Sequence, residues 1–307
     1  MSSAVASDLL HLLSSKTRSN LMARSHIRSA ARGELERLDF LEVDTPVLGE
    51  RVEEYPAGHF RVSQASGPDL WLVQSPQIFK QALIASGVER YFQFAHCFRD
   101  NDREPGRTDY LREFIQLDVE MVARTVDEVI AVAEKVVTSI TDELDVELPP
   151  VPFPRIDYRA AMERYGSDRP DLRAHGQIAS CVWVTDFPLG YTSASGSIML
   201  ERHPMALPHS LPRSAQGLLD TRSHSFDLVI NGYEIASGDL RISDRSLQAD
   251  LLELAALDPR DFDDLLTVLE DCPPHGGFGL GIDRICMQLL DAKSVAEVSA
   301  FPDGFGA

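Results

Sequence analysis

The sequence predicts an α+β fold in which antiparallel strand pairs lie beside amphipathic helices. Residues 9–38 and 126–144 carry apolar side chains at helical spacing. Residues 91–98 and 111–121 have the character of two strands that flank a polar loop. Asn231-Gly232 stands between two further apolar runs, and Asn-Gly favours a hairpin with a type I′ turn. Strands joined in this way pair antiparallel, so we expect an antiparallel sheet flanked by helices.

Composition and length exclude several classes of protein. The 307 residues allow two domains or one large mixed domain, and the hydrophobic fraction of 44% favours a packed core over disorder. No stretch of about 18 apolar residues is present, so no membrane span or membrane partner is expected. The first 13 residues lack the basic start and apolar core of a signal peptide. The four cysteines have no metal-ligand spacing, which favours reduced thiols in a cytoplasmic protein.

The charge of the chain argues against extended contacts with nucleic acid. The formal net charge is −19, and no basic patch is evident apart from a modest density of arginine in residues 16–37. We therefore expect no DNA partner. A small local contact with RNA remains compatible with this charge, because net charge does not define one patch.

Residues 74–121 form the segment around which the rest is organised. Ser75-Pro76 is suited to begin a helix, with Ser75 as its cap. Gln77 and Lys80 are three residues apart and therefore share one face of that helix. Arg99 stands where the first strand enters the polar loop. Its fixed fork of donors and permanent charge suit a phosphate-bearing ligand, although a solvated hairpin tip is the alternative.

The hairpin around Asn231-Gly232 brings two carboxylates together. Pairing through the turn places Asp227 and Glu234 diagonally on one face, about 7 Å apart at the backbone. Such a pair could hold Mg²⁺ with nucleotide phosphates as further ligands, and two exposed acids on a sheet are the alternative. Arg241 is seven residues after Glu234, so regular alternation would place the two on opposite faces of the strand. A bulge would bring them to the same face, and Gly238 is the candidate position for it.

A glycine-rich run closes the pattern. Residues 276–281 contain four glycines, which allow close approach of backbone to a nucleotide, and Arg284 follows at the start of a helix. The N-terminus of a helix favours anions, so Arg284 is placed to meet a phosphate.

These segments, in this order, resemble the three signature motifs of class II aminoacyl-tRNA synthetases, in the form seen in aspartyl-tRNA synthetases. The helix and strand that end at Thr45-Pro46 resemble the first motif, residues 91–121 the second, and residues 276–290 the third. The resemblance runs from about Leu21 to Pro302. It implies a catalytic domain of residues 21–307 after an N-terminal extension of residues 1–20. It further implies the class II antiparallel sheet flanked by helices, and a homodimer formed through the first motif.

The resemblance assigns a nucleotide site. Arg99 matches the residue that contacts the α-phosphate and the reacting carboxylate, and Arg284 matches one that meets the γ-phosphate; both are candidate catalytic residues. Asp227 and Glu234 match metal ligands, so ATP and Mg²⁺ are implied. The candidate ATP-binding residues are Arg99, Asn101, Arg107, Gly281 and Arg284.

The resemblance also assigns an amino-acid pocket. Gln77 and Lys80 line it, Glu54 and Asp118 match residues that hold the substrate ammonium, and His203 matches a loop residue that closes over the adenylate. Arg241 matches the arginine that pairs with the side-chain carboxylate of the substrate. Lys80 and Arg241 together imply an acidic substrate, aspartate or a close analogue, because an asparaginyl enzyme would not want two cations there.

Two departures from the family pattern bear on which molecule accepts the activated amino acid. Asn101 stands where the family has a glutamate that helps to read adenine, and Glu104-Pro105-Gly106 is inserted in the same loop. Only some twenty residues precede the match, so we expect no anticodon-binding barrel. These features favour transfer of the activated aspartate to ammonia or another amine, as in ammonia-dependent asparagine synthetase and related archaeal paralogues. A tRNA recognised by its acceptor end alone, and a catalytically inactive regulatory paralogue, are the alternatives. The carboxylate that is activated, α or β, stays open.

Overall fold

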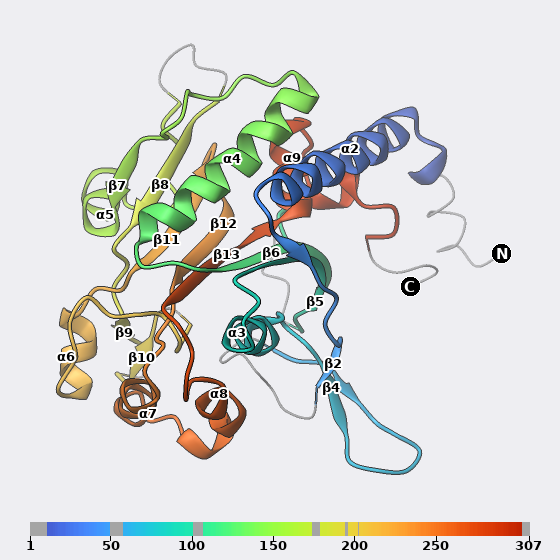
Figure 1. Ribbon diagram of the computed structural model, residues 1–307. Coiled ribbons are helices and arrows are strands. Elements are labelled where there is room, and N and C mark those ends of the chain that lie inside the picture. The colour runs from blue at the N-terminus through green and yellow to red at the C-terminus, as the bar shows by residue number, and fades with distance from the viewer. Residues whose placement is uncertain are drawn as a thin grey trace.

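An eight-stranded sheet runs through the centre of the protein in the computed structural model, which describes residues 11–49, 58–100, 107–173, 179–193, 196–201 and 203–302 (Figure 1). The order of the strands is β1-β5-β6-β13-β12-β11-β8-β7. All neighbours pair antiparallel except β1 with β5 and β7 with β8, so the predicted α+β class is confirmed. The strands are β1 Leu41–Glu42, β5 Arg90–Phe98, β6 Glu113–Val122, β7 Arg155–Asp157, β8 Cys181–Thr185, β11 Ser225–Ile230, β12 Tyr233–Leu240 and β13 His275–Gly281.

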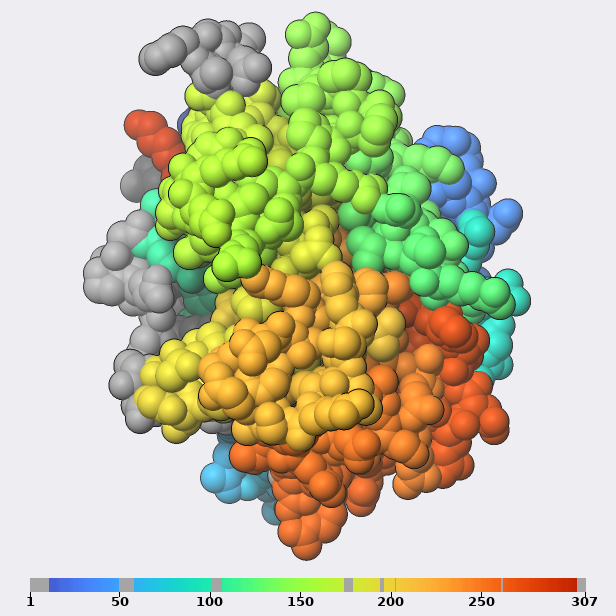
Figure 2. Space-filling model, turned by 90° about the vertical axis from the view of Figure 1, so that its left-hand side faces the viewer, coloured from blue at the N-terminus to red at the C-terminus, as the bar shows by residue number. Residues whose placement is uncertain are grey.

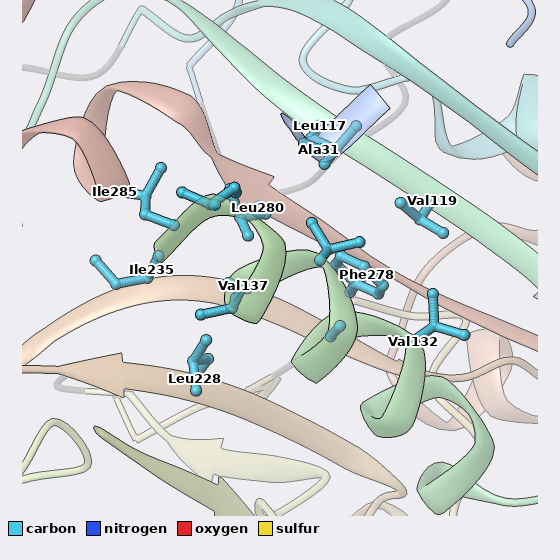
Figure 3. Packing of buried hydrophobic residues seen from close by; sticks show 14 of the residues in the cluster. Ala31, Leu117, Val119, Val132, Val137, Leu228, Ile235, Phe278, Leu280 and Ile285 are labelled. Atoms are coloured by element: carbon cyan, nitrogen blue, oxygen red, sulfur yellow. The ribbon is translucent and has the colours of Figure 1, made fainter. Parts of the chain in front are cut away.

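Three helices pack on one face of this sheet: α2 (Ser15–Arg37), α4 (Val126–Leu144) and α9 (Ile282–Leu289). Alternate residues of each strand point toward these helices, for example Leu117 and Val119 of β6 and Phe278 of β13 (Figure 3). The sequence predicted α4 with its observed bounds, and the Thr125 side chain caps its first turn. The predicted boundary after residue 20 falls within α2, which is continuous there.

Further helices lie below the sheet in Figure 1: α3 (Gln77–Ala85), α6 (Ala215–Asp220), α7 (Arg245–Leu254) and α8 (Asp263–Val268). Pro76 is the N-cap of α3 and no side chain caps the helix, so the prediction that Ser75 is the cap was wrong. Figure 2 shows the side where α5 (Tyr158–Tyr165) lies above the orange segment that contains α6 and α7. No helix in the described ranges is long and apolar enough to cross a membrane.

Short elements complete the fold. Two small sheets have the orders β2-β4-β3 and β10-β9. Their strands, and the two 3-10 turns, are β2 Leu48–Gly49, β3 Arg61–Val62, β4 Leu70–Leu72, β9 Gly190–Thr192, β10 Ile198–Leu200, η1 Pro259–Phe262 and η2 Val295–Val298.

The hairpin between β11 and β12 positions much of the site. Asn231 and Gly232 have positive φ values of 53° and 84°, as the predicted type I′ turn requires, and Val229 pairs with Glu234. The next pair is Leu228 with Ala236, so Ile235 is an additional residue on β12. This bulge lies at Ile235 and not at Gly238, which corrects the predicted position.

The packing around β12 explains the position of the bulge. Ile235 and Ala236 are both buried in the core cluster, whereas a regular alternation after Glu234 would turn Ala236 to the opposite face. Gly238 serves close packing instead, because a Cβ atom there would lie 2.3 Å from the carbonyl oxygen of Gly277. As a result Ser237, Asp239 and Arg241 face away from the helices, on the side of the sheet that carries the site.

Candidate active site

A cavity of about 470 Å³ lies on the sheet face opposite α2 and α4. Because side chains alternate along a strand, one face of β6, β12 and β13 is turned toward this cavity. The residues of that face that line it are Gln116 and Asp118 of β6, Ser237 and Asp239 of β12, and Gly279 and Gly281 of β13. Most of the described residues that the sequence assigned to a site line this cavity. They are Gln77, Lys80, Arg99, Arg107, Asp118, His203, Glu234, Arg241, Gly281 and Arg284.

A buried charge network forms the deepest part of this cavity. The ammonium of Lys80 lies 3.1 Å from Asp118 Oδ1 and 3.1 Å from Glu120 Oε2. Arg241 donates from Nε and Nη2 to the two oxygens of Glu120, at 3.0 and 3.2 Å, and from Nη1 to Asp239 at 2.5 Å. We call Lys80, Asp118, Glu120, Asp239 and Arg241 the charged floor. Each of the five residues is at most 6% exposed.

The charges on the floor stabilise one another. Burial alone would raise the pKa of Glu120, but the charges of Arg241 and Lys80 outweigh it and lower that pKa to about 2. The pKa of Arg241 is raised because Asp239 and Glu120 favour its charged form despite burial. Burial lowers the pKa of His275, which lies behind Glu120 and hydrogen-bonds the carbonyl of Pro273 through Nδ1 at 2.8 Å. His275 is therefore neutral at pH 7, and Glu120 and Arg241 carry their charges.

Gly277 is required for this geometry. A Cβ atom at Gly277 would lie 2.1 Å from the carbonyl oxygen of Val119 and 2.4 Å from Glu120 Oε2. The absence of a side chain on β13 is therefore what lets the Glu120 carboxylate lie against the neighbouring strand and reach both cations.

Gln77 and Arg99 stand at the sides of the cavity. Gln77, 4% exposed, lines the cavity, and its Nε2 has no hydrogen-bond partner among the residues that the structure describes. A buried donor in that position is suited to an acceptor oxygen of a ligand. The guanidinium of Arg99 lies 5.3 Å from the ring centroid of Phe114, and the Tyr110 hydroxyl donates to the Arg99 carbonyl at 2.6 Å. These contacts fix Arg99 at the end of β5.

Arg284 also lines the cavity and is held by two carboxylates. Its Nη1 donates to Glu234 Oε1 at 3.1 Å, and its Nη2 lies 3.3 Å from Asp109 Oδ2. Arg107 donates to the same Asp109 oxygen at 3.0 Å. Burial would raise the pKa of Asp109, but the hydrogen bond from Arg107 and the charge of Arg284 leave it below its usual value. Two guanidinium groups thus converge on one carboxylate, as they could on a phosphate.

The predicted metal ligands differ in their surroundings. Asp227 pairs with Ser237 across the hairpin, which puts it on the same sheet face as Glu234, as predicted. Glu234 lines the cavity, whereas Asp227 is 1% exposed and is not among the described residues that line it. Within the described part of the chain, no three His, Cys, Asp or Glu side chains are grouped to hold a metal by themselves. A Mg²⁺ ion held by Glu234 would need phosphate or water oxygens to complete its shell.

Two predicted residues, Glu54 and Asn101, lie outside the described residues. Among the described residues of the site, five acids were missed in the sequence: Asp109, Glu120, Asp168, Asp239 and Asp283. The sequence could have indicated two of these acids. Glu120 is two residues after Asp118, and Asp239 is two residues before Arg241, so each shares a strand face with a predicted site residue. Asp283 accepts from Arg24 of α2 at 2.5 Å and from the amide of Ile115 at 3.1 Å, so it joins α2 to the site.

A second hollow, of about 960 Å³, lies between α2 and α4 on the other side of the sheet. It is an open groove, and Gly33, Lys135 and Asp142 are among its lining residues. None of the predicted site residues lines it, and it lacks the convergent buried charges of the first cavity. The cavity above the charged floor is therefore the candidate active site.

The fold and the cavity define the catalytic core of a class II aminoacyl-tRNA synthetase. The family model for class II tRNA synthetases (D, K and N) matches residues 2–304. The chain therefore belongs to this family, which confirms the resemblance drawn from its motifs.

Among known proteins, the chain is similar to enzymes named for aspartate and asparagine. It is 28% identical to aspartate–tRNA(Asp/Asn) ligase of Trichodesmium erythraeum, with 92% of this chain and 70% of that protein aligned. It is 28% identical to the enzyme of the same name from Chlamydia muridarum, with 92% and 71% aligned. The first alignment spans 425 residues, so well over one hundred residues of that relative have no counterpart in this shorter chain.

Solved structures have the same fold. Asparaginyl-tRNA synthetase of Pyrococcus horikoshii, complexed with asparaginyl-adenylate, gives a TM-score of 0.77 at 21% identity over 98% of this chain and 71% of that one. Aspartyl-tRNA synthetase of Entamoeba histolytica gives 0.74 at 23% identity over 98% and 61%. At these identities the comparison establishes the arrangement of the chain alone.

Proposed function

We propose that this protein is an ATP-dependent ligase that activates aspartate, or a close analogue of it, as an acyl-adenylate and passes the acyl group to a nucleophile. The observation that carries the proposal is the convergence of Gln77, Arg99 and Arg284 on one cavity above the charged floor. The names of the relatives, aspartate–tRNA(Asp/Asn) ligases, support an amino acid of this class.

The chemistry is an in-line attack of a substrate carboxylate on the α-phosphorus of ATP, with pyrophosphate as the leaving group. The protein contributes position and charge rather than a covalent intermediate. Arg99, which contacts Phe114 and Tyr110, would meet the reacting groups, and Arg284, which lines the same cavity, would meet the departing pyrophosphate. Glu234, which lines the cavity, would hold Mg²⁺, with Asp227 of the neighbouring strand as the second candidate ligand. Mg²⁺ neutralises phosphate charge when bound.

The amino acid occupies the charged floor in this proposal. Asp118 lines the cavity and has the charge to hold the substrate ammonium, and the orphan donor of Gln77 suits the substrate carbonyl or carboxylate. His203 also lines the cavity and is positioned to cover a bound adenylate. Lys80 and Arg241 then meet the side chain of the substrate.

For the acceptor we propose a small amine, such as ammonia, because the net charge of −19 opposes a broad contact with RNA. The second candidate is the acceptor end of a tRNA, which the names of the relatives favour. Incubation with ATP, amino acid and either ammonium or tRNA, followed by mass spectrometry of the products, distinguishes the two. We expect an amide with ammonium and no charged tRNA.

The activation step is tested with Arg99→Ala, compared with Arg159→Ala on the exposed face of α5. Arg99→Ala should lower the rate of ATP–pyrophosphate exchange about 10²- to 10³-fold, because it removes a fixed charge at the reacting phosphate. The Arg159→Ala protein should match the wild type. Undiminished exchange in Arg99→Ala would refute the assignment of this cavity.

A further inference from the structure

Arg169 is a cation at the active-site cavity that the sequence motifs did not indicate, and the inference drawn from it rests on the proposed function. It lies in residues 166–173, which follow α5, and its side chain lines the cavity. Its guanidinium is held loosely: Nε lies 3.5 Å from Oδ1 of the adjacent Asp168, and the side chain is 44% exposed. By contrast, the Arg284 guanidinium is held by two carboxylates. Arg169 can therefore turn to a ligand without breaking a buried ion pair.

The backbone that carries Arg169 is fixed on the turn of the β11–β12 hairpin. The amide of Leu172 donates to Ser180 Oγ at 3.3 Å. The amide of Ser180 donates to Asn231 Oδ1 at 2.9 Å, and the amide of Asn231 donates to the Ser180 carbonyl at 3.1 Å. Gly232 packs against the same segment, since a Cβ atom there would lie 3.7 Å from the carbonyl oxygen of Arg169. The Arg169 side chain therefore starts from a fixed point beside the turn.

This anchoring places Arg169 at the end of the cavity that is assigned to phosphates. Glu234, the proposed metal ligand, is two residues after Gly232 and accepts from Arg284 Nη1. Asp239, in the charged floor, is five residues further along β12, a separation of about 15 Å. Because the amino acid is assigned to the charged floor and the pyrophosphate to Arg284, Arg169 lies on the pyrophosphate side.

The proposed reaction develops negative charge on that side. Attack of the substrate carboxylate forms a bond from its oxygen to the α-phosphorus and breaks the bond from the α-phosphorus to the bridging oxygen. The electron pair of the broken bond leaves with pyrophosphate, so charge accumulates on the β- and γ-phosphates. A guanidinium offers paired donors to phosphate oxygens, and a half-exposed side chain can meet the incoming nucleotide and later release pyrophosphate.

We propose that Arg169 binds the β- and γ-phosphates of ATP and the departing pyrophosphate, as a third arginine of the activation step beside Arg99 and Arg284. Its contact with Asp168 is exchanged for phosphate oxygens when the nucleotide binds. Arg169 thereby distinguishes nucleotides by the length of their phosphate chain and makes no contact with the adenosine or the amino acid.

The test is calorimetric binding of ATP and AMP, each with Mg²⁺, to the wild type, Arg169→Ala and the control Arg173→Ala. Arg173 lies in the same segment, pairs with Asp171, and is not among the described residues that line the cavity. Arg169→Ala should weaken the binding of ATP about tenfold or more, because a charge-assisted contact is lost. Its affinity for AMP, which lacks the β- and γ-phosphates, should stay within about twofold of the wild type. Arg173→Ala should match the wild type with both nucleotides.

Absence of ATP binding by the wild type, unchanged ATP affinity in Arg169→Ala, an equal loss for ATP and AMP, or an equal loss in Arg173→Ala overturns the proposal. Arg169→Gln removes the same charge with a longer side chain, and it replaces Arg169→Ala if the thermal melt of that protein differs from the wild type.

ATP–pyrophosphate exchange separates this proposal from the proposed function. Selective loss of ATP binding in Arg169→Ala, without exchange by the wild type with any amino acid, supports the phosphate contact and counts against the ligase activity. Exchange at limiting ATP that is lost in Arg99→Ala and unchanged in Arg169→Ala supports the ligase activity and overturns the role of Arg169.

Discussion

Glu120→Gln should destabilise the protein strongly, because Glu120 is the carboxylate that joins both cations of the charged floor. It is fully buried and contacts Lys80 once and Arg241 twice. Loss of its charge leaves two buried cations with incomplete compensation. Removal of one partner from a buried ion pair typically costs about 3–5 kcal/mol in the free energy of unfolding.

The pKa of Glu120 gives an independent magnitude. It is about 2 in the folded protein, against 4.5 for an ordinary glutamate. At about 1.4 kcal/mol per pH unit, this difference corresponds to about 3 kcal/mol of stability at neutral pH. Because the folded pKa is depressed, this contribution is complete above about pH 4.5 and is lost as the pH falls toward 2. Both routes therefore give about 3 kcal/mol near pH 7.

Urea unfolding followed by tryptophan fluorescence measures this difference, and Trp183 is a fully buried reporter. The control is Glu163→Gln, which breaks an exposed pair with Arg159 and should change stability by less than about 1 kcal/mol. At pH 3 the difference between wild type and Glu120→Gln should shrink by more than half. A loss below about 1 kcal/mol at pH 7, or a difference that does not change with pH, would refute the reasoning.

Three other predictions concern the support of the cavity. Gly277→Ala should lower the free energy of unfolding by about 3 kcal/mol or more, because a Cβ atom there has no room. The control Gly33→Ala, in the open part of α2, should raise it by about 0.5–1 kcal/mol. Thermal melts measure both, and equal melting temperatures of the two variants would contradict this. Arg24→Ala leaves the buried Asp283 without its guanidinium partner and should lower stability by about 3 kcal/mol, whereas an unchanged denaturation midpoint would argue against the link. Glu234→Gln should raise the Mg²⁺ concentration for half-maximal exchange about tenfold or more, and an unaltered Mg²⁺ titration would remove Glu234 from the metal site.

The sequence was sufficient for features that depend on local pattern. The helix at 126–144 has apolar residues at helical spacing and a threonine cap, and its bounds were predicted without error. The Asn-Gly turn fixed the first two pairs of the β11–β12 hairpin. Most described site residues named from the motifs also lie in one cavity, because motif spacing already encodes which strand face each residue occupies.

The sequence was insufficient where long-range packing decides. The bulge at Ile235 depends on which side chain fits between β12 and α9, and neither the turn nor the alternation reveals that. The two cations of the pocket were predicted from motifs, but the partners of Arg241 come from β6 and from its own strand. Their pairing depends on the order of strands in the sheet, which local periodicity does not give.

The most direct test of the central claim is ATP–pyrophosphate exchange across a panel of amino acids, without tRNA. The structure predicts exchange confined to asparagine, aspartate and their close analogues, and its loss in Arg99→Ala. Exchange with a large apolar or basic amino acid would contradict the assigned pocket. Silence with every amino acid, in a folded protein that has ATP and Mg²⁺, would contradict the proposal that this chain forms an acyl-adenylate.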